Sequence, residues 1–178
     1  MVIAFVNATK KWGGVKTWCL DMGVALAAQG HEVHVLGRPG DFVDKAAAAG
    51  LTARAVSFGF VYNPVATLFF LSYFLRHRVD VVVGNVAQDM RTAGLAARLL
   101  GLQVVQHVGS GGDFPESAST RLALSLLRPR HICCSEYVRQ AILKFVPSLA
   151  HHEVHALHPG TEVPSAPQLE AHEPPVLV

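Results

Sequence analysis

The chain has 178 residues, of which 51% are hydrophobic and 16% are charged, and its formal net charge is +2 at pH 7. This length suits one domain with a well-filled core, and the composition excludes an intrinsically disordered chain. The weak positive charge gives no argument for nucleic acid as a partner, so we expect none. The same charge does not exclude small anionic ligands.

Three cysteines, two of them adjacent, offer neither a CxxC pair nor an even number for disulfides, which predicts a reducing, cytoplasmic location. Val2–Val6 is apolar and strand-like, and it lacks the basic start and the cleavage site of a signal peptide. The most apolar stretch, Val56–Leu75, contains Asn63-Pro64 in its middle, so we expect no helix that spans a membrane.

Short runs rich in valine and isoleucine alternate with helical patterns along the chain. This alternation predicts an α/β fold, a Rossmann-like parallel sheet of about seven strands with helices on both faces. Most of the runs are apolar throughout, so the sheet should be central and buried. The expected strands are Val2–Val6, Val33–Leu36, Arg54–Phe58, Asp80–Val83, Gln103–Val108, Ile132–Cys134 and Val154–Leu157.

Apolar spacing and residues that favour helix ends predict the helices between these strands. The apolar stripe of the first helix consists of Val15, Trp18, Cys19, Met22 and Leu26, and this helix ends at Gly30. Pro64 stands at the first position of the third helix, where its missing amide hydrogen costs nothing. The other predicted helices are a short one from Asp41, its cap, to Gly50, then Pro64–Leu75 capped by Asn63, Asp89–Leu100, Ser117–Leu127, and Glu136–Phe145 capped by Ser135.

The regular pattern ends after Glu162, where four prolines stand among small and acidic residues, as in a linker. We therefore expect a Rossmann-like domain over residues 1–163 and a proline-rich linker over residues 164–178. Val176-Leu177-Val178 resembles the first residues of another buried strand. The chain is thus expected to be a fragment with a C-terminal domain missing.

Four segments resemble family 4 (group 1) retaining glycosyltransferases of the GT-B fold. They are Trp12-Gly13-Gly14-Val15-Lys16, Gln29-Gly30-His31-Glu32-Val33-His34-Val35-Leu36, Asp80-Val81-Val82-Val83 and Leu157-His158-Pro159-Gly160-Thr161-Glu162. The last segment is similar to the family's Pro-Gly-Val-Asp type turn, but Thr161 and Glu162 replace valine and aspartate. The resemblance covers about residues 1–162, nearly the whole globular part.

This resemblance implies the N-terminal, acceptor-side half of an enzyme that moves a sugar from a nucleotide-sugar to a glycan or lipid-linked acceptor, with retention. It implies no metal and no cofactor beyond the nucleotide-sugar, and a role in building cell-envelope polysaccharides. In this family the missing C-terminal domain supplies the nucleotide pocket, so the fragment alone should be inactive. Two alternatives stay open: a stand-alone Rossmann-like ligand-binding module without catalysis, and a GT-B sugar-nucleotide epimerase.

Gly13 and Gly14 stand where the first strand gives way to the first helix. Backbone amides at a helix N-terminus favour anions, so this loop is expected to meet the donor diphosphate. Lys16 would add positive potential for the same phosphates. The alternatives are a tight turn that needs glycine and a solvated basic loop.

His107 lies at the carboxyl end of the fifth predicted strand, the edge where parallel sheets collect ligands. It resembles the family's histidine that contacts the transferred sugar or acceptor, and we expect it to be the catalytic-site histidine. The alternative is an ordinary core histidine. Asn85, Asp113 and Glu116 are candidate contacts to acceptor hydroxyls, and in an inverting enzyme Asp113 or Glu116 would act as an acid or base. Turn formation explains Asn85 equally, and helix capping explains the two acidic residues.

The ten histidines invite a metal site, above all in the run His151-His152-Glu153-Val154-His155. A metal-binding HExxH motif places its two histidines four residues apart on a helix, and here the spacing is one residue short. We therefore expect no metal.

The segment Pro64–Arg78 combines an apolar, aromatic helix with the basic residues Arg76-His77-Arg78. Such a helix suits a membrane surface, where it would bring the enzyme to a lipid-linked acceptor at the inner face of the membrane. The alternative is a helix buried between the sheet and its neighbours.

Overall fold

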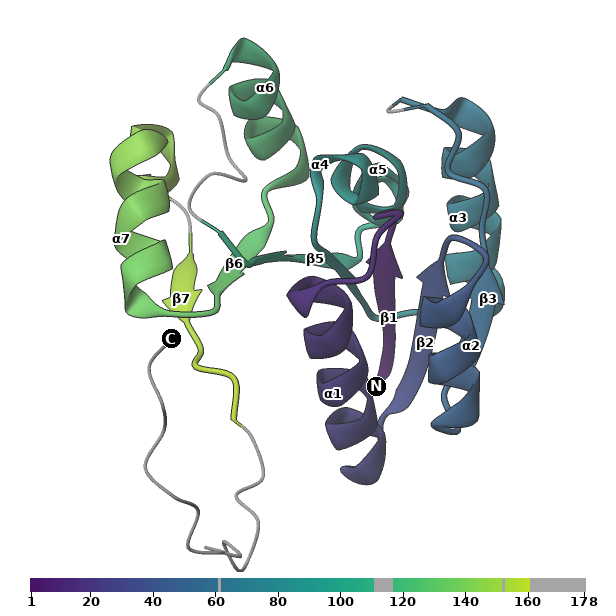
Figure 1. Ribbon diagram of the computed structural model, residues 1–178. Coiled ribbons are helices and arrows are strands. Elements are labelled where there is room, and N and C mark those ends of the chain that lie inside the picture. The colour runs from purple at the N-terminus through teal and green to yellow at the C-terminus, as the bar shows by residue number, and fades with distance from the viewer. Residues whose placement is uncertain (61, 111–116, 152, 161–178) are drawn as a thin grey trace, which may run out of the picture.

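The computed structural model describes residues 1–60, 62–110, 117–151 and 153–160. These residues form a seven-stranded parallel sheet in the order β3-β2-β1-β4-β5-β6-β7, which confirms the predicted Rossmann-like α/β fold (Figure 1). The strands are β1 (Val2–Asn7), β2 (Glu32–Gly37), β3 (Thr52–Ala55), β4 (Val81–Gly84), β5 (Gln103–Val108), β6 (Arg130–Cys133) and β7 (Val154–Ala156).

Helices cover both faces of this sheet. They are α1 (Gly14–Ala28), α2 (Asp41–Ala48), α3 (Pro64–Arg76), α4 (Ala87–Asp89), the π-helical turn η1 (Met90–Gly94), α5 (Leu95–Leu99), α6 (Ala118–Leu127), α7 (Glu136–Phe145) and the 3-10 helix η2 (Pro147–His151). Side chains of α1 and α2 pack on one face, and those of α3, η1 and α5 pack on the other. No helix among the described residues is long and apolar enough to cross a membrane.

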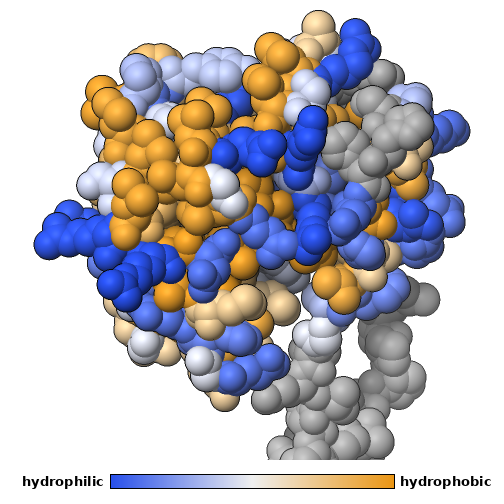
Figure 2. Space-filling view, turned by 180° about the vertical axis from the view of Figure 1, so that it is seen from behind, coloured by the Kyte–Doolittle hydropathy of each residue, from blue (hydrophilic) through white to orange (hydrophobic). Residues whose placement is uncertain are grey.

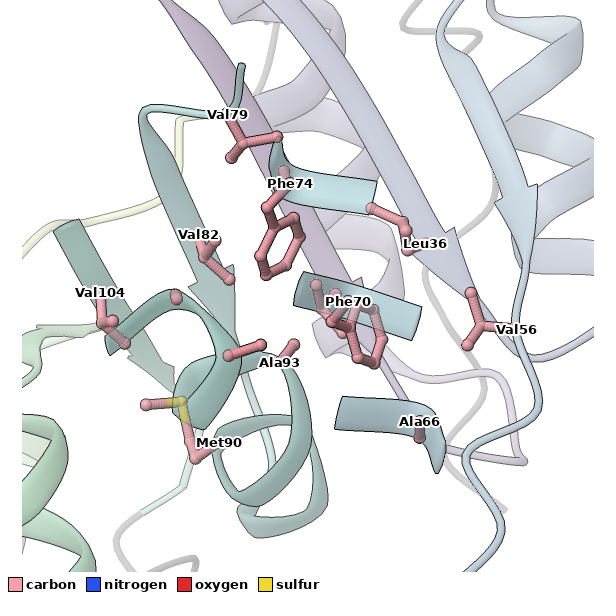
Figure 3. Packing of buried hydrophobic residues seen from close by; sticks show 14 of the residues in the cluster. Leu36, Val56, Ala66, Phe70, Phe74, Val79, Val82, Met90, Ala93 and Val104 are labelled. Atoms are coloured by element: carbon pink, nitrogen blue, oxygen red, sulfur yellow. The ribbon is translucent and has the colours of Figure 1, made fainter. Parts of the chain in front are cut away.

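The core on the α3 side is built around two phenylalanines. Phe70 and Phe74 of α3 are buried and lie with Val82 of β4 and Leu36 of β2 in one cluster (Figure 3). Burial of a large apolar side chain contributes about 1.5–3 kcal/mol, so this cluster fixes α3 firmly against the sheet. Asn63 caps α3 as predicted, because its side chain accepts hydrogen bonds from the backbone of the first turn.

Several predicted boundaries were wrong. The helix predicted over Asp89–Leu100 begins at Ala87 and includes the π-helical turn η1, and the sixth strand begins at Arg130 rather than Ile132. The third strand spans Thr52–Ala55 rather than Arg54–Phe58. Val56 and Phe58 are still buried, but in the loop after β3, where they pack with α3, so their apolar alternation did not mark a strand. In α2 the cap is Gly40, and Asp41 is the first helical residue, whose carboxylate lies near the positive end of the helix.

The fully buried Asp89 joins the ends of β1 and β4. Its carboxylate accepts hydrogen bonds from the backbone N–H groups of Ala8 at 2.7 Å, Asn85 at 2.9 Å and Val86 at 2.9 Å. Burial raises the pKa of Asp89 to about 7, and these three donors oppose that rise. Asp89 therefore satisfies three buried donors that have no strand partner at this point.

Asp89→Asn is expected to lower the free energy of unfolding by about 2 kcal/mol, because an amide has one acceptor oxygen and would turn its NH₂ group toward a buried donor. Urea unfolding followed by circular dichroism measures this change. Asp44→Asn, the same substitution at an exposed position of α2, should change stability by less than about 0.5 kcal/mol. Equal midpoints for Asp89→Asn and the wild type would show that the carboxylate does not hold the strand ends.

Candidate functional site

The strand order in the sheet reverses between the parallel strands β1 and β4. From β1 the chain continues to β2 and β3 on one side, and it returns to β4 on the other. Ligands of open parallel sheets bind outside the carboxyl ends of the strands at such a point. Gly14 follows β1, Asn85 follows β4 and His107 lies near the end of β5, so the fold brings all three to this edge.

A cavity of about 620 Å³ opens at this edge, between the first turns of α1 and the ends of β5 and β6. We call it the His107 cavity. Residues that line it include Gly14, Thr17, Trp18, His107, Ser110, Cys134 and the acidic residue Asp21. The wall thus combines a helix N-terminus, an aromatic surface and a few polar groups, which is typical of a small-molecule site.

The ring of His107 is held on two sides. It stacks on Trp18, with 3.7 Å between ring centroids and 9° between ring planes. Its Nδ1 lies 3.1 Å from Oδ1 of Asn85. The Asn85 amide nitrogen donates to the Val6 carbonyl oxygen at 3.2 Å, so its Oδ1 is the acceptor and His107 Nδ1 carries the hydrogen. The other ring nitrogen, Nε2, is then an unprotonated acceptor.

His107 Nε2 is buried and has no hydrogen-bond partner among the described residues. Burial lowers the pKa of His107 to about 4, so the ring is neutral at neutral pH. A buried acceptor without a partner is costly in a folded protein, and at a cavity wall a ligand or a water molecule can supply the missing bond. The acceptor suits a hydroxyl group of a bound molecule.

The backbone conformation does not require glycine at positions 13 and 14, before and at the start of α1. Gly13, the N-cap, is extended with φ −179°, a conformation that any residue adopts. A Cβ built on Gly13 or Gly14 meets nothing within 4 Å, so space rather than strain is what the glycines provide. Glycine has no side chain to cap α1, and no described side chain caps it, so the first amides of the helix are available to a ligand at the positive end of the helix dipole.

The other predicted site residues are placed differently. Lys16 lines a separate cavity on the other side of α1 and does not line the His107 cavity. Asn85 is buried beneath His107 and orients its ring, rather than lining the cavity itself. Asp113 and Glu116 lie outside the described residues. No three His, Cys, Asp or Glu side chains in the described part of the chain are arranged to hold a metal ion.

Sequence reasoning missed two residues that shape the site. Trp18 was expected only as part of an apolar stripe, yet it stacks on His107 and lines the cavity. Asp89 was expected only as the start of a helix, yet it anchors the strand ends beside Asn85. No spacing in the sequence distinguishes a stacking tryptophan from a core tryptophan, because both occupy the inner face of an amphipathic helix.

Comparisons with known proteins agree with this architecture. Residues 12–164 match the sequence model of the family described as Glycosyltransferase Family 4. No curated protein matches the chain in sequence.

Three solved structures show the likeness in fold. They are a glycosyltransferase from Rickettsia africae ESF-5 (TM-score 0.72, 16% identity), Anabaena HepE in complex with UDP-glucose (TM-score 0.68, 16% identity) and the lipopolysaccharide outer core galactosyltransferase WaaB (TM-score 0.64, 14% identity). The matches cover 89%, 91% and 96% of this chain but 43%, 44% and 50% of those chains. The chain therefore spans half of their length or less, and its fold is that of one part of a GT-B glycosyltransferase.

The lowered pKa of His107 predicts how stability depends on pH. Between about pH 6.5 and the folded pKa of about 4, the unfolded chain binds more protons at this residue than the folded chain. His107 should therefore contribute a fall in the free energy of unfolding as pH falls through this range, by up to about 1.4 kcal/mol per pH unit, while Asp89, whose pKa is raised, contributes in the opposite direction.

Urea unfolding at a series of pH values measures this dependence. His107→Gln should remove the contribution of His107, so its free energy of unfolding should fall less, or rise more, than that of the wild type as pH falls between these values, whereas His155→Gln, at an exposed histidine, should leave the profile as in the wild type. An unchanged slope in His107→Gln would mean that His107 is not held neutral by burial.

Proposed function

The chain belongs to Glycosyltransferase Family 4, and on that premise we propose that it forms the acceptor-side half of an enzyme that transfers a sugar from a nucleotide-sugar to a glycan or lipid-linked acceptor with retention. The structural relative HepE is in complex with UDP-glucose, which supports a nucleotide-sugar as donor. The relative WaaB is a lipopolysaccharide galactosyltransferase, which supports a glycan on a lipid as acceptor. A second domain of the GT-B fold is proposed to supply the opposite wall of the cleft.

The open N-terminus of α1 is proposed to bind the diphosphate of the donor. Negative charge accumulates on the leaving diphosphate as the bond between sugar and phosphate breaks. Oriented amides at Gly13 and Gly14, with the positive end of the α1 dipole, stabilise this charge without a side chain between them and the oxygen atoms. The acceptor oxygen bonds to the anomeric carbon as the diphosphate leaves, and its proton passes to a phosphate oxygen.

His107 is proposed to bind a hydroxyl group of the transferred sugar. Its Nε2, which has no hydrogen-bond partner in the described part of the chain, is the single observation that carries this proposal, because this buried acceptor lies in the wall of the cavity beside Gly14. The stack on Trp18 and the hydrogen bond to Asn85 fix the plane and the tautomer of the ring. A fixed acceptor positions the sugar relative to the diphosphate, which lowers the entropic cost of transfer.

The enzyme proposal is tested on the full-length protein, with hydrolysis and transfer measured across common nucleotide-sugars. His107→Ala should lower kcat/KM about 10²-fold, since it removes a positioned polar contact. Gly14→Ala should fold as well as the wild type, because there is room for its Cβ, but should lower kcat/KM about ten-fold by intruding on the diphosphate. His155→Ala is the exposed control. Absence of turnover with every donor would refute the proposal, as would wild-type kinetics in both site variants.

The outer face of α3 is proposed to contact a membrane surface. The inner face of this helix is buried, but Val65, Leu68 and Leu75 are 72%, 64% and 64% exposed, so the helix is apolar on both sides. Phe60 and Tyr62, just before α3, are also exposed. Figure 2 shows this side of the molecule, with a broad hydrophobic area beside hydrophilic residues.

Basic residues border this apolar face. Arg76 ends α3 and lines a surface hollow together with Arg54 of β3, and the exposed Arg78 follows two residues later. An apolar face bordered by arginines suits the headgroup region of a membrane that contains anionic lipids. A lipid-linked acceptor would then be presented from the same surface.

The double variant Leu68→Glu with Leu75→Glu should lose most of its binding to vesicles, because it places two carboxylates on the proposed membrane face. Co-sedimentation with phosphatidylcholine vesicles, with and without phosphatidylglycerol, measures this binding. Val24→Glu is the matched control, an exposed apolar position on α1, which packs on the other face of the sheet. The proposal would be contradicted if the wild-type chain did not bind anionic vesicles, or if the double variant bound them like the wild type.

A further inference from the structure

A second cavity, of about 600 Å³, lies between the loop after β1 and the loop after β2. We call it the basic cavity. Residues that line it include Lys10, Trp12, Lys16, Arg38, Asp41 and Phe42. Among the described residues it shares no lining residue with the His107 cavity, and three of the four charged groups in its wall are cations.

Lys16 is an unusual member of this wall because its side chain is only 7% exposed. Its Nζ lies 3.5 Å from the carbonyl oxygen of Lys10, the one hydrogen bond it makes among the described residues, and 5.7 Å from the ring centroid of Phe42. Burial lowers the pKa of Lys16, Asp41 opposes this and Arg38 adds to it. An ammonium group has three donors, so two donors of Lys16 have no hydrogen-bond partner among the described residues.

Arg38 is held in place by neighbours on its other side. Its Nε donates to the Ala8 carbonyl oxygen at 2.6 Å, and its Nη2 donates to Oε1 of Gln88 at 3.2 Å. Its guanidinium also lies 5.5 Å from the ring centroid of Phe58. Because these contacts fix the side chain, Arg38 would lose little conformational entropy on binding an anion.

The N-terminus of α2 completes the cavity. Gly40, its N-cap, has φ 120° and no side chain that accepts hydrogen bonds from the first amides of the helix. These amides therefore add positive potential at the same place as Lys16 and Arg38. Asp41, in the first turn, is exposed and is the one carboxylate in the wall.

We infer that the basic cavity binds an anionic group, a phosphate or a carboxylate, carried by the acceptor. The inference rests on the proposed function in taking the occupant to be the acceptor, while the anion site itself follows from Lys16, Arg38 and the open end of α2. The volume suits a sugar ring together with its anionic group. Donor and acceptor would then lie on opposite sides of the first turn of α1, and Lys16 serves the acceptor rather than the donor diphosphate.

The test measures binding to the full chain of three probes, glucose-6-phosphate, glucuronate and glucose, by isothermal titration calorimetry. At least one anionic probe should bind about ten-fold more tightly than glucose, since a charge-assisted contact replaces a neutral one. Lys16→Met, which keeps the apolar stem and removes the charge, should abolish this preference. Lys144→Met, the same change at an exposed position of α7, should leave it intact.

Lys10→Met provides a second variant that does not depend on a buried side chain, because Lys10 is exposed at the edge of the cavity. It should weaken binding of the anionic probe about two- to five-fold by lowering the local positive potential. The probe that shows the preference, the phosphate or the uronate, identifies the anionic group. Circular dichroism establishes that each variant is folded.

The inference is overturned if neither anionic probe binds more tightly than glucose, or if folded Lys16→Met keeps the preference. It is also overturned if Gly14→Ala removes the preference as fully as Lys16→Met, because the anion would then occupy the His107 cavity. Failure of the proposed function gives a different result: nucleotide-sugars are not turned over by the full-length protein, but the Lys16-dependent binding of the anionic probe persists.

Discussion

The carboxylate of Asp89 holds together the ends of β1 and β4, the two neighbouring strands at which the strand order of the parallel sheet reverses. Strand pairing satisfies the backbone groups of both strands up to this point, and beyond it three amides need another acceptor. One buried side chain supplies it, at the cost of a carboxyl group in a position that raises its pKa. Because Asn85 receives one of these hydrogen bonds and in turn holds His107, the orientation of the imidazole follows from the closure of the two strands.

The two cavities differ in how they attract a ligand. In the His107 cavity the proposed recognition groups are neutral: open amides at Gly14, an imidazole whose pKa is lowered by burial, and the face of Trp18. The acidic residue Asp21 of α1 also lines this cavity. In the basic cavity formal charges dominate, with Lys16 and Arg38 fixed near a helix end. Neutral dipoles stabilise charge that develops during a reaction, whereas fixed cations bind charge that is already present. This difference supports a donor on one side of α1 and an anionic acceptor on the other.

Local chemistry explains which features were predictable. Asn63 and Ser135 cap their helices as predicted, because a cap depends on residues within one turn, and Ser117, predicted as the first helical residue, is the cap of α6. The meeting of β1, β4 and β5 at one edge was predictable as well, since parallel strands end together. The division of the β1–α1 region between two cavities was not predictable. Gly14 and Trp18 are four residues apart and share a helix face, while Lys16 lies about 200° around the helix from Gly14, and which loop each side meets is decided by tertiary packing.

The two expectations for α3 were posed as alternatives, yet the structure gives the helix both a buried and an exposed apolar face. An amphipathic helix needs one apolar stripe to fold, and Phe70 and Phe74 provide it. The exposed Val65, Leu68 and Leu75 form a second apolar stripe on the outer side of the helix. The proposed membrane contact would give this stripe a partner, and the arginines at its border favour a membrane that contains anionic lipids.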